Sequence, residues 1–148
     1  MRPHNSDYRQ YVEAIFASAP FIDALGVRLL DVGPGWCETE LVVRPDHLQQ
    51  DDFIHAGVQA TMADHSSGAA AGSLIAPDET VLTVEFKINL LRPAHGERLF
   101  CRAEVIKPGR RITVSESDVY AVQDAERRHV ARATVTLAIV ENPRTRAS

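Results

Sequence analysis

The sequence predicts an α+β domain in which a single antiparallel sheet of about six strands wraps around one long helix. Two observations indicate this. One long helical segment, residues 55–72, interrupts six segments of strand character, and the last four strand segments are joined by short turns. Short turns make neighbouring strands antiparallel, so these segments form one sheet. The concave face of that sheet is then the place where the helix buries its apolar side.

The N-terminal part predicts a helix followed by a hairpin. Apolar side chains recur at helical spacing over residues 7–18, which indicates an N-terminal helix within residues 1–19. A short turn-like segment follows at 21–25. Strands are expected at 27–32 and 36–43, because a Gly-Pro-Gly turn joins them.

The C-terminal half changes to a period of two residues, which is typical of half-buried strands. A polar, acidic loop at 45–54 leads into the long helix, and residues 124–128 are expected to be a charged turn. The tail, 141–148, is polar and expected to fray. Strands are expected at 82–90, 99–105, 111–122 and 131–139.

Composition excludes several classes of protein. A chain of 148 residues with net charge −4 is expected to form a single domain, residues 1–148, without the basic surface that binds nucleic acid. No run of about 18 apolar residues is present for a membrane span, and the first residues lack the apolar region of a signal peptide. Cys37 and Cys101 fall in strand segments and are expected to be buried free thiols, which fits a cytoplasmic protein.

The long helix carries the candidate chemistry. Its start, around Gly57, exposes backbone N–H groups that can bind an oxyanion, and Asp64 further along can act as a base or nucleophile. Such a pair suits acyl transfer. The rest of the helix is so poor in bulky side chains that it is expected to lie close to the sheet. The small residues of that face are Ala60, Ala63, Gly68, Ala71 and Gly72.

These motifs resemble those of hotdog-fold acyl-CoA thioesterases of the phenylacetate-pathway (PaaI-like) type, over residues 21–140. The chain has Ala56-Gly57 where the family usually has Gly-Gly, and Gln49 where it often has Asn. The resemblance rests on the order and spacing of His55-Ala56-Gly57, Asp64 nine residues after the His, Thr83-Val-Glu-Phe-Lys-Ile-Asn89, Arg92-Pro93-Ala94 with Gly96, and Gly109-Arg110.

The resemblance implies hydrolysis of an acyl-CoA thioester to a carboxylic acid and CoA. Asp64 then attacks the thioester carbonyl or activates the water that does, and the Gly57 N–H donates to the oxyanion. His55 either holds the loop geometry, donating to backbone or to Gln49, or transfers a proton. Gln49 is either a site amide that holds the leaving thiolate, the carbonyl or a water, or a solvated one. Thr83 either orients the attacking water or is an ordinary strand residue.

The same resemblance implies contacts to the CoA phosphates, because the family binds CoA near the turns that follow these strands. Arginine suits phosphate through bidentate hydrogen bonds. The candidate CoA-binding residues are Arg92, Gly109, Arg110 and Arg111.

Two other chemistries do not fit these residues. Asp64-His65-Ser66 cannot form a triad, because consecutive helical residues point about 100° apart. The spacing of His55, Asp64 and His65 matches no metal-ligand motif. We therefore expect no metal, and no cofactor beyond the CoA of the substrate. Two alternative functions stay open: a hotdog hydratase or dehydratase of acyl thioesters, and a non-catalytic acyl-CoA binding protein.

Apolar residues on both registers of the sheet predict self-association. The row Leu82, Val84, Phe86, Ile88 and Leu90 is expected to face the helix. By alternation Thr83 then faces away from the helix and reaches a site only at a subunit boundary. Apolar residues on the opposite register would be exposed in a monomer, so we expect a homodimer or homotetramer with a shared active site. They are Val81, Leu91, Phe100, Ile106 and Val140.

Overall fold

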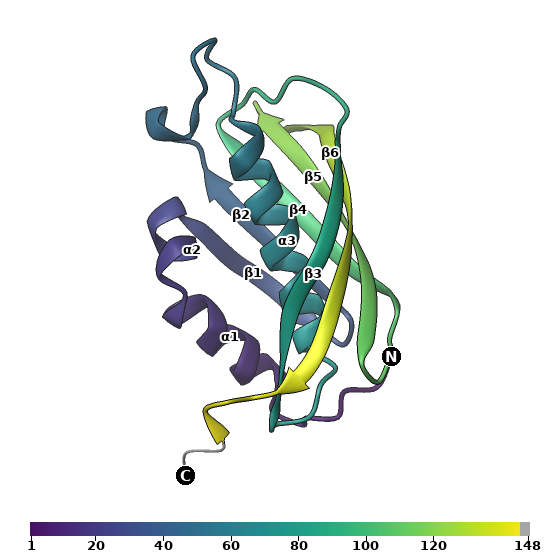
Figure 1. Cartoon of the computed structure of the whole chain (residues 1–148). Helices are drawn as coiled ribbons and strands as arrows, with labels where there is room; N and C mark the ends of the chain where they lie inside the picture. The colour runs from purple at the N-terminus through teal and green to yellow at the C-terminus, as the bar shows by residue number, and fades with distance from the viewer. Residues whose placement is uncertain (146–148) are drawn as a thin grey trace.

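The computed structural model describes residues 1–145, and its ten elements place one six-stranded sheet around a central helix (Figure 1). All neighbouring strands pair antiparallel in the order β1-β2-β4-β5-β6-β3. This confirms the predicted α+β hotdog fold. The strands are β1 (Val27–Gly33), β2 (Trp36–Val42), β3 (Glu79–Leu90), β4 (Arg98–Lys107), β5 (Ile112–Gln123) and β6 (Glu126–Glu141).

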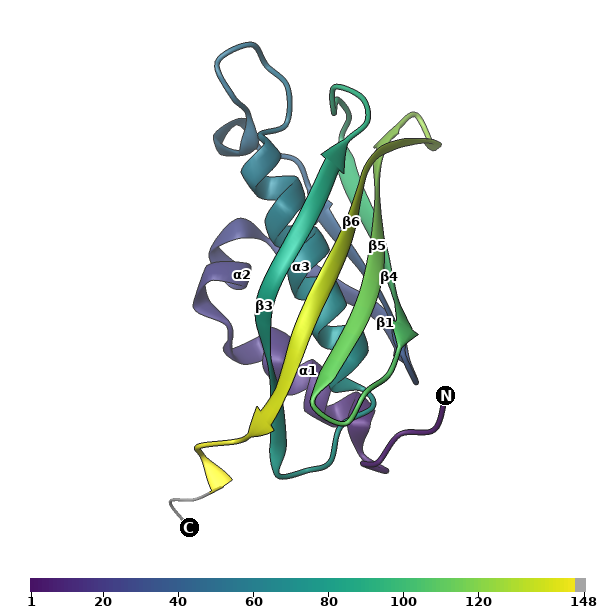
Figure 2. The same ribbon diagram turned by 45° about the vertical axis from the view of Figure 1, so that its right-hand side comes forward.

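The long helix α3 (Ala56–Gly72) lies in the concave face of the sheet, and the N-terminal helix α1 (Tyr8–Ser18) packs against both α3 and β1 (Figure 2). The segment expected to be turn-like is instead a short helix, α2 (Pro20–Leu25). Proline at its first position and Gly26 in the left-handed region (φ 88°) after its end provide the start and stop signals.

Two other local predictions need correction. The loop at 45–54 contains a short 3₁₀ helix, η1 (Pro45–His47), and its His47 is buried. The charged turn at 124–128 is only two residues long, because β6 already begins at Glu126. Asp124 and Ala125 both have positive φ, as a tight two-residue hairpin requires. Of the tail expected at 141–148, residues 146–148 lie outside the described part of the chain.

The core forms between α3 and the sheet, as the small-residue face predicts. Ala63, Ala71 and Gly72 are buried, whereas Ala60 and Gly68 are half-buried. Both cysteines are free and buried, in agreement with the prediction. Burial raises the pKa of the Cys101 thiol to about 12. The largest fully buried side chains include Leu41, Met62, Leu99 and Leu137.

A bulge in β3 corrects only the start of the predicted helix-facing row, because Phe86, Ile88 and Leu90 pair with the buried Val135, Ala133 and Ala131 and share their face as expected. Thr83 pairs with Leu137, but Glu85 pairs with Thr136, so the alternation of faces shifts by one residue between them. Thr83 therefore shares the helix-side face with the buried Leu137. Leu82, which pairs with Ala138, faces the other way. The expectation that Thr83 points away from the helix is wrong for the same reason.

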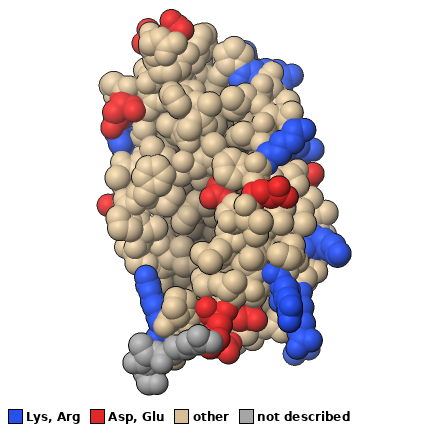
Figure 3. All heavy atoms as spheres, viewed as in Figure 1, with Lys and Arg blue, Asp and Glu red and all other residues tan. Residues whose placement is uncertain are grey.

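β3 is an edge strand with an apolar surface. Leu82, Val84, Phe86 and Leu90 are 44–60% exposed, although β6 covers one side of the strand. In Figure 3 most of the face that carries α3 and β3 is tan, with Lys and Arg atoms mostly along its margins and Asp or Glu atoms near its middle. An exposed apolar edge of this kind is normally covered by a partner strand.

The residues expected on the opposite register behave in different ways. Leu91 and Ile106 are about half exposed, as predicted. Phe100 is buried, because the Arg127 guanidinium lies 3.9 Å from the centre of its ring. Val81 is half-buried and packs against the core rather than facing outward, and Val140 is half-buried.

Candidate active site

Asp64 and Thr83 meet between α3 and β3. The Thr83 hydroxyl donates to Asp64 Oδ1 over 2.7 Å, which the bulge in β3 makes possible within one chain. Burial raises the pKa of the Asp64 carboxyl, and the Thr83 hydrogen bond opposes this by stabilising the charged form. The pair therefore holds an oriented carboxylate whose proton affinity is increased, as a general base requires.

The free backbone N–H at the start of α3 lies one residue before the predicted oxyanion donor. The Gly57 N–H is not free, because it donates to His55 Nδ1 over 2.8 Å. The Ala56 N–H, at the first helical position, has no hydrogen-bond partner among residues 1–145. The free donor at this helix end is therefore the N–H of Ala56, one residue before the Gly57 that the sequence predicted.

The glycine at position 57 has a structural role that differs from the predicted role as oxyanion donor. A Cβ placed on it would lie 3.0 Å from His55 Nδ1, so glycine lets the imidazole approach the backbone. Because Nδ1 accepts this hydrogen bond, a neutral His55 carries its proton on Nε2. His55 thus accepts from a backbone N–H, whereas the sequence favoured donation to the backbone or to Gln49.

A cavity of about 560 Å³ lies at this N-terminal end of α3. Arg92 lines it and donates to the His129 carbonyl oxygen over 3.0 Å, and the Gln49 side-chain oxygen accepts from the Asp51 N–H. The cavity therefore brings together the predicted Gln49, His55 and Arg92. The residues that line it include Gln49, His55, Ala56, Gln59, Leu90 and Arg92.

Sequence reasoning missed Gln59. It is 3% exposed, its Nε2 donates to the Ile54 carbonyl oxygen over 3.2 Å, and its Oε1 is buried without a hydrogen-bond partner in the described chain. The one available signal was its position four residues after His55, which places it on the same helix face.

His47 fixes the loop that carries His55. Its ring contacts the Leu25 carbonyl oxygen through Nε2 at 2.8 Å and accepts from the Arg44 N–H at 3.0 Å. The His47 carbonyl in turn accepts from the His55 N–H over 2.9 Å. The C-terminal end of α2 thereby anchors the entry to α3.

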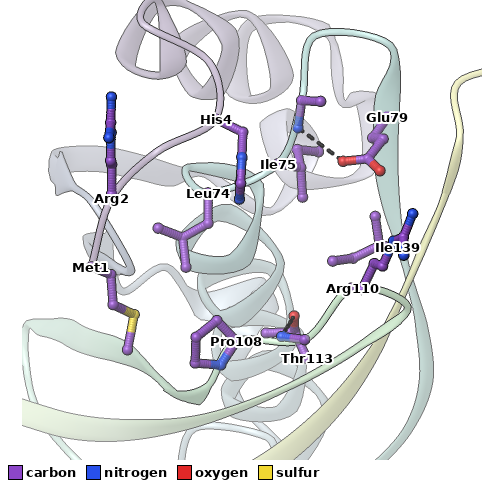
Figure 4. Close-up of a pocket in the computed structure, with 12 residues that line it drawn as sticks. Met1, Arg2, His4, Leu74, Ile75, Glu79, Pro108, Arg110, Thr113 and Ile139 are labelled. Carbon is purple, nitrogen blue, oxygen red and sulfur yellow. Dashed lines mark hydrogen bonds between the residues drawn. The ribbon is translucent and has the colours of Figure 1, made fainter.

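The remaining CoA-binding candidates lie elsewhere. Gly109 and Arg110 line a second cavity, of about 390 Å³, beyond the C-terminal end of α3 (Figure 4). Only glycine fits at 109, because a Cβ there would lie 1.9 Å from the Ile112 carbonyl oxygen. Arg111 is exposed and is not among the residues that line this cavity.

One chain does not bring Asp64 to the free Ala56 N–H. The two residues are eight positions apart on the same helix, which separates them by about 12 Å along its axis. A carboxylate and an oxyanion donor that act on one carbonyl must both lie within about 3 Å of it. The two halves of the predicted site are thus present but separate.

A sheet wrapped around a helix, with a half-buried helical carboxylate and an open helix N-terminus, is the arrangement expected of a hotdog thioester hydrolase. Residues 52–127 match the model of the thioesterase superfamily, and the chain belongs to that family. A crystal structure of a thioesterase family protein from Silicibacter pomeroyi is 43% identical, with a TM-score of 0.89, covering 91% of this chain and 99% of that one.

Two further proteins, of lower sequence identity, are also similar to this chain. A phenylacetic acid degradation protein PaaI from Thermus thermophilus is 26% identical, with a TM-score of 0.70, over 80% of this chain and 97% of that one. The 1,4-dihydroxy-2-naphthoyl-CoA hydrolase of Listeria monocytogenes is 28% identical over 94 residues, which are 64% of this chain and 76% of that protein. The PaaI-like resemblance is thereby confirmed.

None of the helices in residues 1–145 is long and apolar enough to cross a membrane.

Proposed function

We propose that this protein hydrolyses an acyl-CoA thioester to a carboxylic acid and CoA. The observation that carries the proposal is the Asp64–Thr83 pair on the central helix of a thioesterase-superfamily fold. The CoA portion is supported by the similar naphthoyl-CoA hydrolase and by Arg92 and Arg110 at the two cavities, which form no ion pair within residues 1–145. The reaction proceeds without a metal or cofactor, in the cytoplasm.

Asp64 supplies the base or the nucleophile. As a base it takes a proton from water, the hydroxyl oxygen adds to the thioester carbon, the C–S bond breaks, and the thiolate takes the proton from Asp64. As a nucleophile its oxygen adds to the thioester carbon and the C–S bond breaks, which releases the CoA thiolate and leaves an anhydride; water then cleaves the anhydride to the acid and free Asp64, and the proton released goes to the thiolate. In both routes Thr83 holds the carboxylate, and either route is compatible with its hydrogen bond of 2.7 Å.

The start of α3 stabilises the oxyanion. The free Ala56 N–H donates to the thioester oxygen, aided by the positive end of the helix. Gly57 contributes by holding His55, whose Nε2–H becomes a second donor at the cavity. Gln49 offers an amide at the same cavity for the carbonyl, the leaving thiolate or a water.

Two chains share each active site in this proposal. The separation of about 12 Å between Asp64 and Ala56 within one helix is closed when Asp64 of one protomer faces Ala56 of its partner. The exposed apolar edge strand β3, through Leu82, Val84 and Phe86, is the surface where the protomers join. The assembly is a homodimer, or a homotetramer of two such dimers.

Thiol release from a panel of acyl-CoAs tests the function. Wild type is expected to release CoA, and Asp64→Asn to lose at least 100-fold in kcat while keeping its fold, since the carboxylate is the reacting group. The matched control is Asp78→Asn, which alters an exposed carboxylate in the turn before β3. Retention of a tenth of the rate by Asp64→Asn contradicts the assignment. Hydration of an enoyl-CoA in place of hydrolysis identifies the protein as a hydratase, and binding without turnover identifies a binding protein.

A further inference from the structure

The cavity beyond the C-terminal end of α3 combines an apolar floor with a basic rim. Figure 4 shows Arg2 and Arg110 on opposite sides of it, with His4 between them. Arg2 and His4 come from the segment before α1, whereas Arg110 comes from the turn between β4 and β5. The apolar floor consists of Leu74, Ile75, Pro108 and Ile139.

The two arginines of this cavity form no ion pair within the described chain. Six other arginines form ion pairs with carboxylates, but neither Arg2 nor Arg110 pairs with any group of residues 1–145. The one carboxylate in the lining, Glu79, already accepts the Ala76 N–H over 2.9 Å. The rim therefore carries net positive charge, which suits an anionic ligand with an apolar body.

The segment that supplies Arg2 and His4 is packed onto the domain. The His4 N–H donates to the Leu74 carbonyl oxygen over 3.1 Å, just after the end of α3. Met1 lies against the β1–β2 turn, where a Cβ on Gly35 would come within 2.6 Å of its sulfur. The contacts of Met1 and His4, one on each side of Arg2 in the sequence, thus hold Arg2 at the cavity.

The cavity also lies at a suitable distance from the reacting carboxylate. Glu79 lines it, and Thr83, which binds Asp64, lies four residues further along β3. Four strand residues span about 13 Å. An extended linker running beside β3 would cover that distance between a thioester at Asp64 and the wall of the cavity formed by Glu79.

We propose that Arg2 and His4 bind the phosphates of the CoA nucleotide, opposite Arg110, with the adenine on the apolar floor. The inference rests on the proposed acyl-CoA hydrolysis and adds binding residues that come from the segment before α1. Arg2 and Arg110 grip the phosphates through charge-assisted hydrogen bonds from both sides. His4 and the buried Thr113 hydroxyl, which accepts the Gly109 N–H over 3.2 Å, add further polar contacts.

Two substrates with the same acyl group test this proposal: the acyl-CoA, and the N-acetylcysteamine thioester that lacks the nucleotide. For Arg2→Gln we expect the KM for the acyl-CoA to rise about tenfold, the loss of one charge-assisted hydrogen bond, with kcat unchanged. The KM for the short thioester stays at the wild-type value. The control is Arg128→Gln, an exposed arginine on β6 that lines neither cavity.

Equal effects of Arg2→Gln on both thioesters, or no effect on either, overturn the proposal. Calorimetric titration with adenosine 3′,5′-bisphosphate separates this result from a failure of the proposed function. Binding to the wild type that weakens about tenfold in Arg2→Gln supports the site even when no acyl-CoA is hydrolysed. No binding to the wild type overturns the site while leaving thioester hydrolysis in place.

Discussion

Thr83 donates its hydroxyl to Asp64 Oδ1 over 2.7 Å, and a single extra residue in β3 makes this contact possible. Without the bulge between Thr83 and Glu85, strict alternation could not place Thr83 and Phe86 on one face. The local irregularity of the strand thus couples an edge strand to the carboxylate of the central helix. Bulges commonly re-aim side chains in this way beside active sites.

Replacing Thr83 by valine shifts the pH dependence of hydrolysis. The hydroxyl stabilises the charged form of Asp64, so its loss raises the pKa of that carboxyl further above the usual range. A base must be deprotonated, so the acid limb of the kcat/KM profile moves to higher pH in Thr83→Val. Thr83→Ser keeps the hydroxyl and restores the wild-type limb. Coincident profiles for wild type and Thr83→Val would mean that the contact has no role in catalysis.

Enlarging the buried face of α3 destabilises the fold. Ala63 is fully buried between the helix and the sheet, so Ala63→Leu is expected to cost about 1–3 kcal/mol of unfolding free energy by overpacking. Ala60→Leu, on a half-buried position of the same helix, is the matched comparison and costs less. Urea denaturation measures both, and equal midpoints for wild type and Ala63→Leu would show that the helix is not enclosed.

His65 makes the folded protein sensitive to acid. Burial lowers the pKa of its imidazole from 6.5 to about 4, and the ring packs edge-on against Phe16 at 4.6 Å. The pKa of His65 is lower in the folded state than in the unfolded state, so protonation of the imidazole favours unfolding. The free energy of unfolding is therefore at its full value above pH 6.5 and falls as the pH is lowered towards 4. The loss is at most about 3 kcal/mol.

The pH dependence of unfolding checks the His65 prediction. His65→Gln removes the titration and flattens the unfolding free energy between pH 6.5 and 4, whereas His95→Gln, at an exposed histidine, leaves the wild-type slope. An unchanged slope in His65→Gln would assign the acid sensitivity to other groups.

Two buried serines respond oppositely to alanine. Ser66 shares a hydrogen bond of 2.8 Å with Thr39, so Ser66→Ala leaves a buried hydroxyl unpaired and costs about 1–3 kcal/mol. Ser117 is equally buried, but its hydroxyl has no partner within residues 1–145, so Ser117→Ala is neutral or stabilising. Melting temperatures of the two variants test these expectations. A large fall in the melting temperature of Ser117→Ala would reveal a bound water at that hydroxyl.

Long periodic segments of this fold were predictable from the sequence. The small-residue helix and the alternating strands each bury one face, so their period alone fixes their type. The short α2 and the two-residue turn at Asp124 were not, because capping and positive φ are decided by a few local contacts. The bulge in β3 left no signal, because apolar and polar residues alternate without interruption from Leu82 to Leu90, across the position of the bulge.

The candidate site was predictable to a similar degree. The Asp64 position follows from its spacing to His55, since the number of residues between them sets their separation on one helix. Which N–H is free at the start of α3 depends on the rotamer of His55, which the sequence does not encode locally. Gln59 and the segment that carries Arg2 were missed because their significance arises only from folding.

Mixing two inactive variants tests most directly whether two chains build each site. Ala56→Pro removes the proposed oxyanion donor at the first helical position, where proline is tolerated, and the His55 backbone (φ −57°, ψ 139°) already suits a following proline. Each single variant, Ala56→Pro or Asp64→Asn, is expected to lose at least 100-fold in kcat.

After subunit exchange between equal amounts of the two variants, half of the dimers are mixed and each mixed dimer has one intact site. The account predicts recovery of about a quarter of the wild-type activity. Confirmed exchange, by mass spectrometry of differently tagged chains, with no recovery of acyl-CoA hydrolysis would contradict it, because Asp64 and Ala56 would then act within one chain.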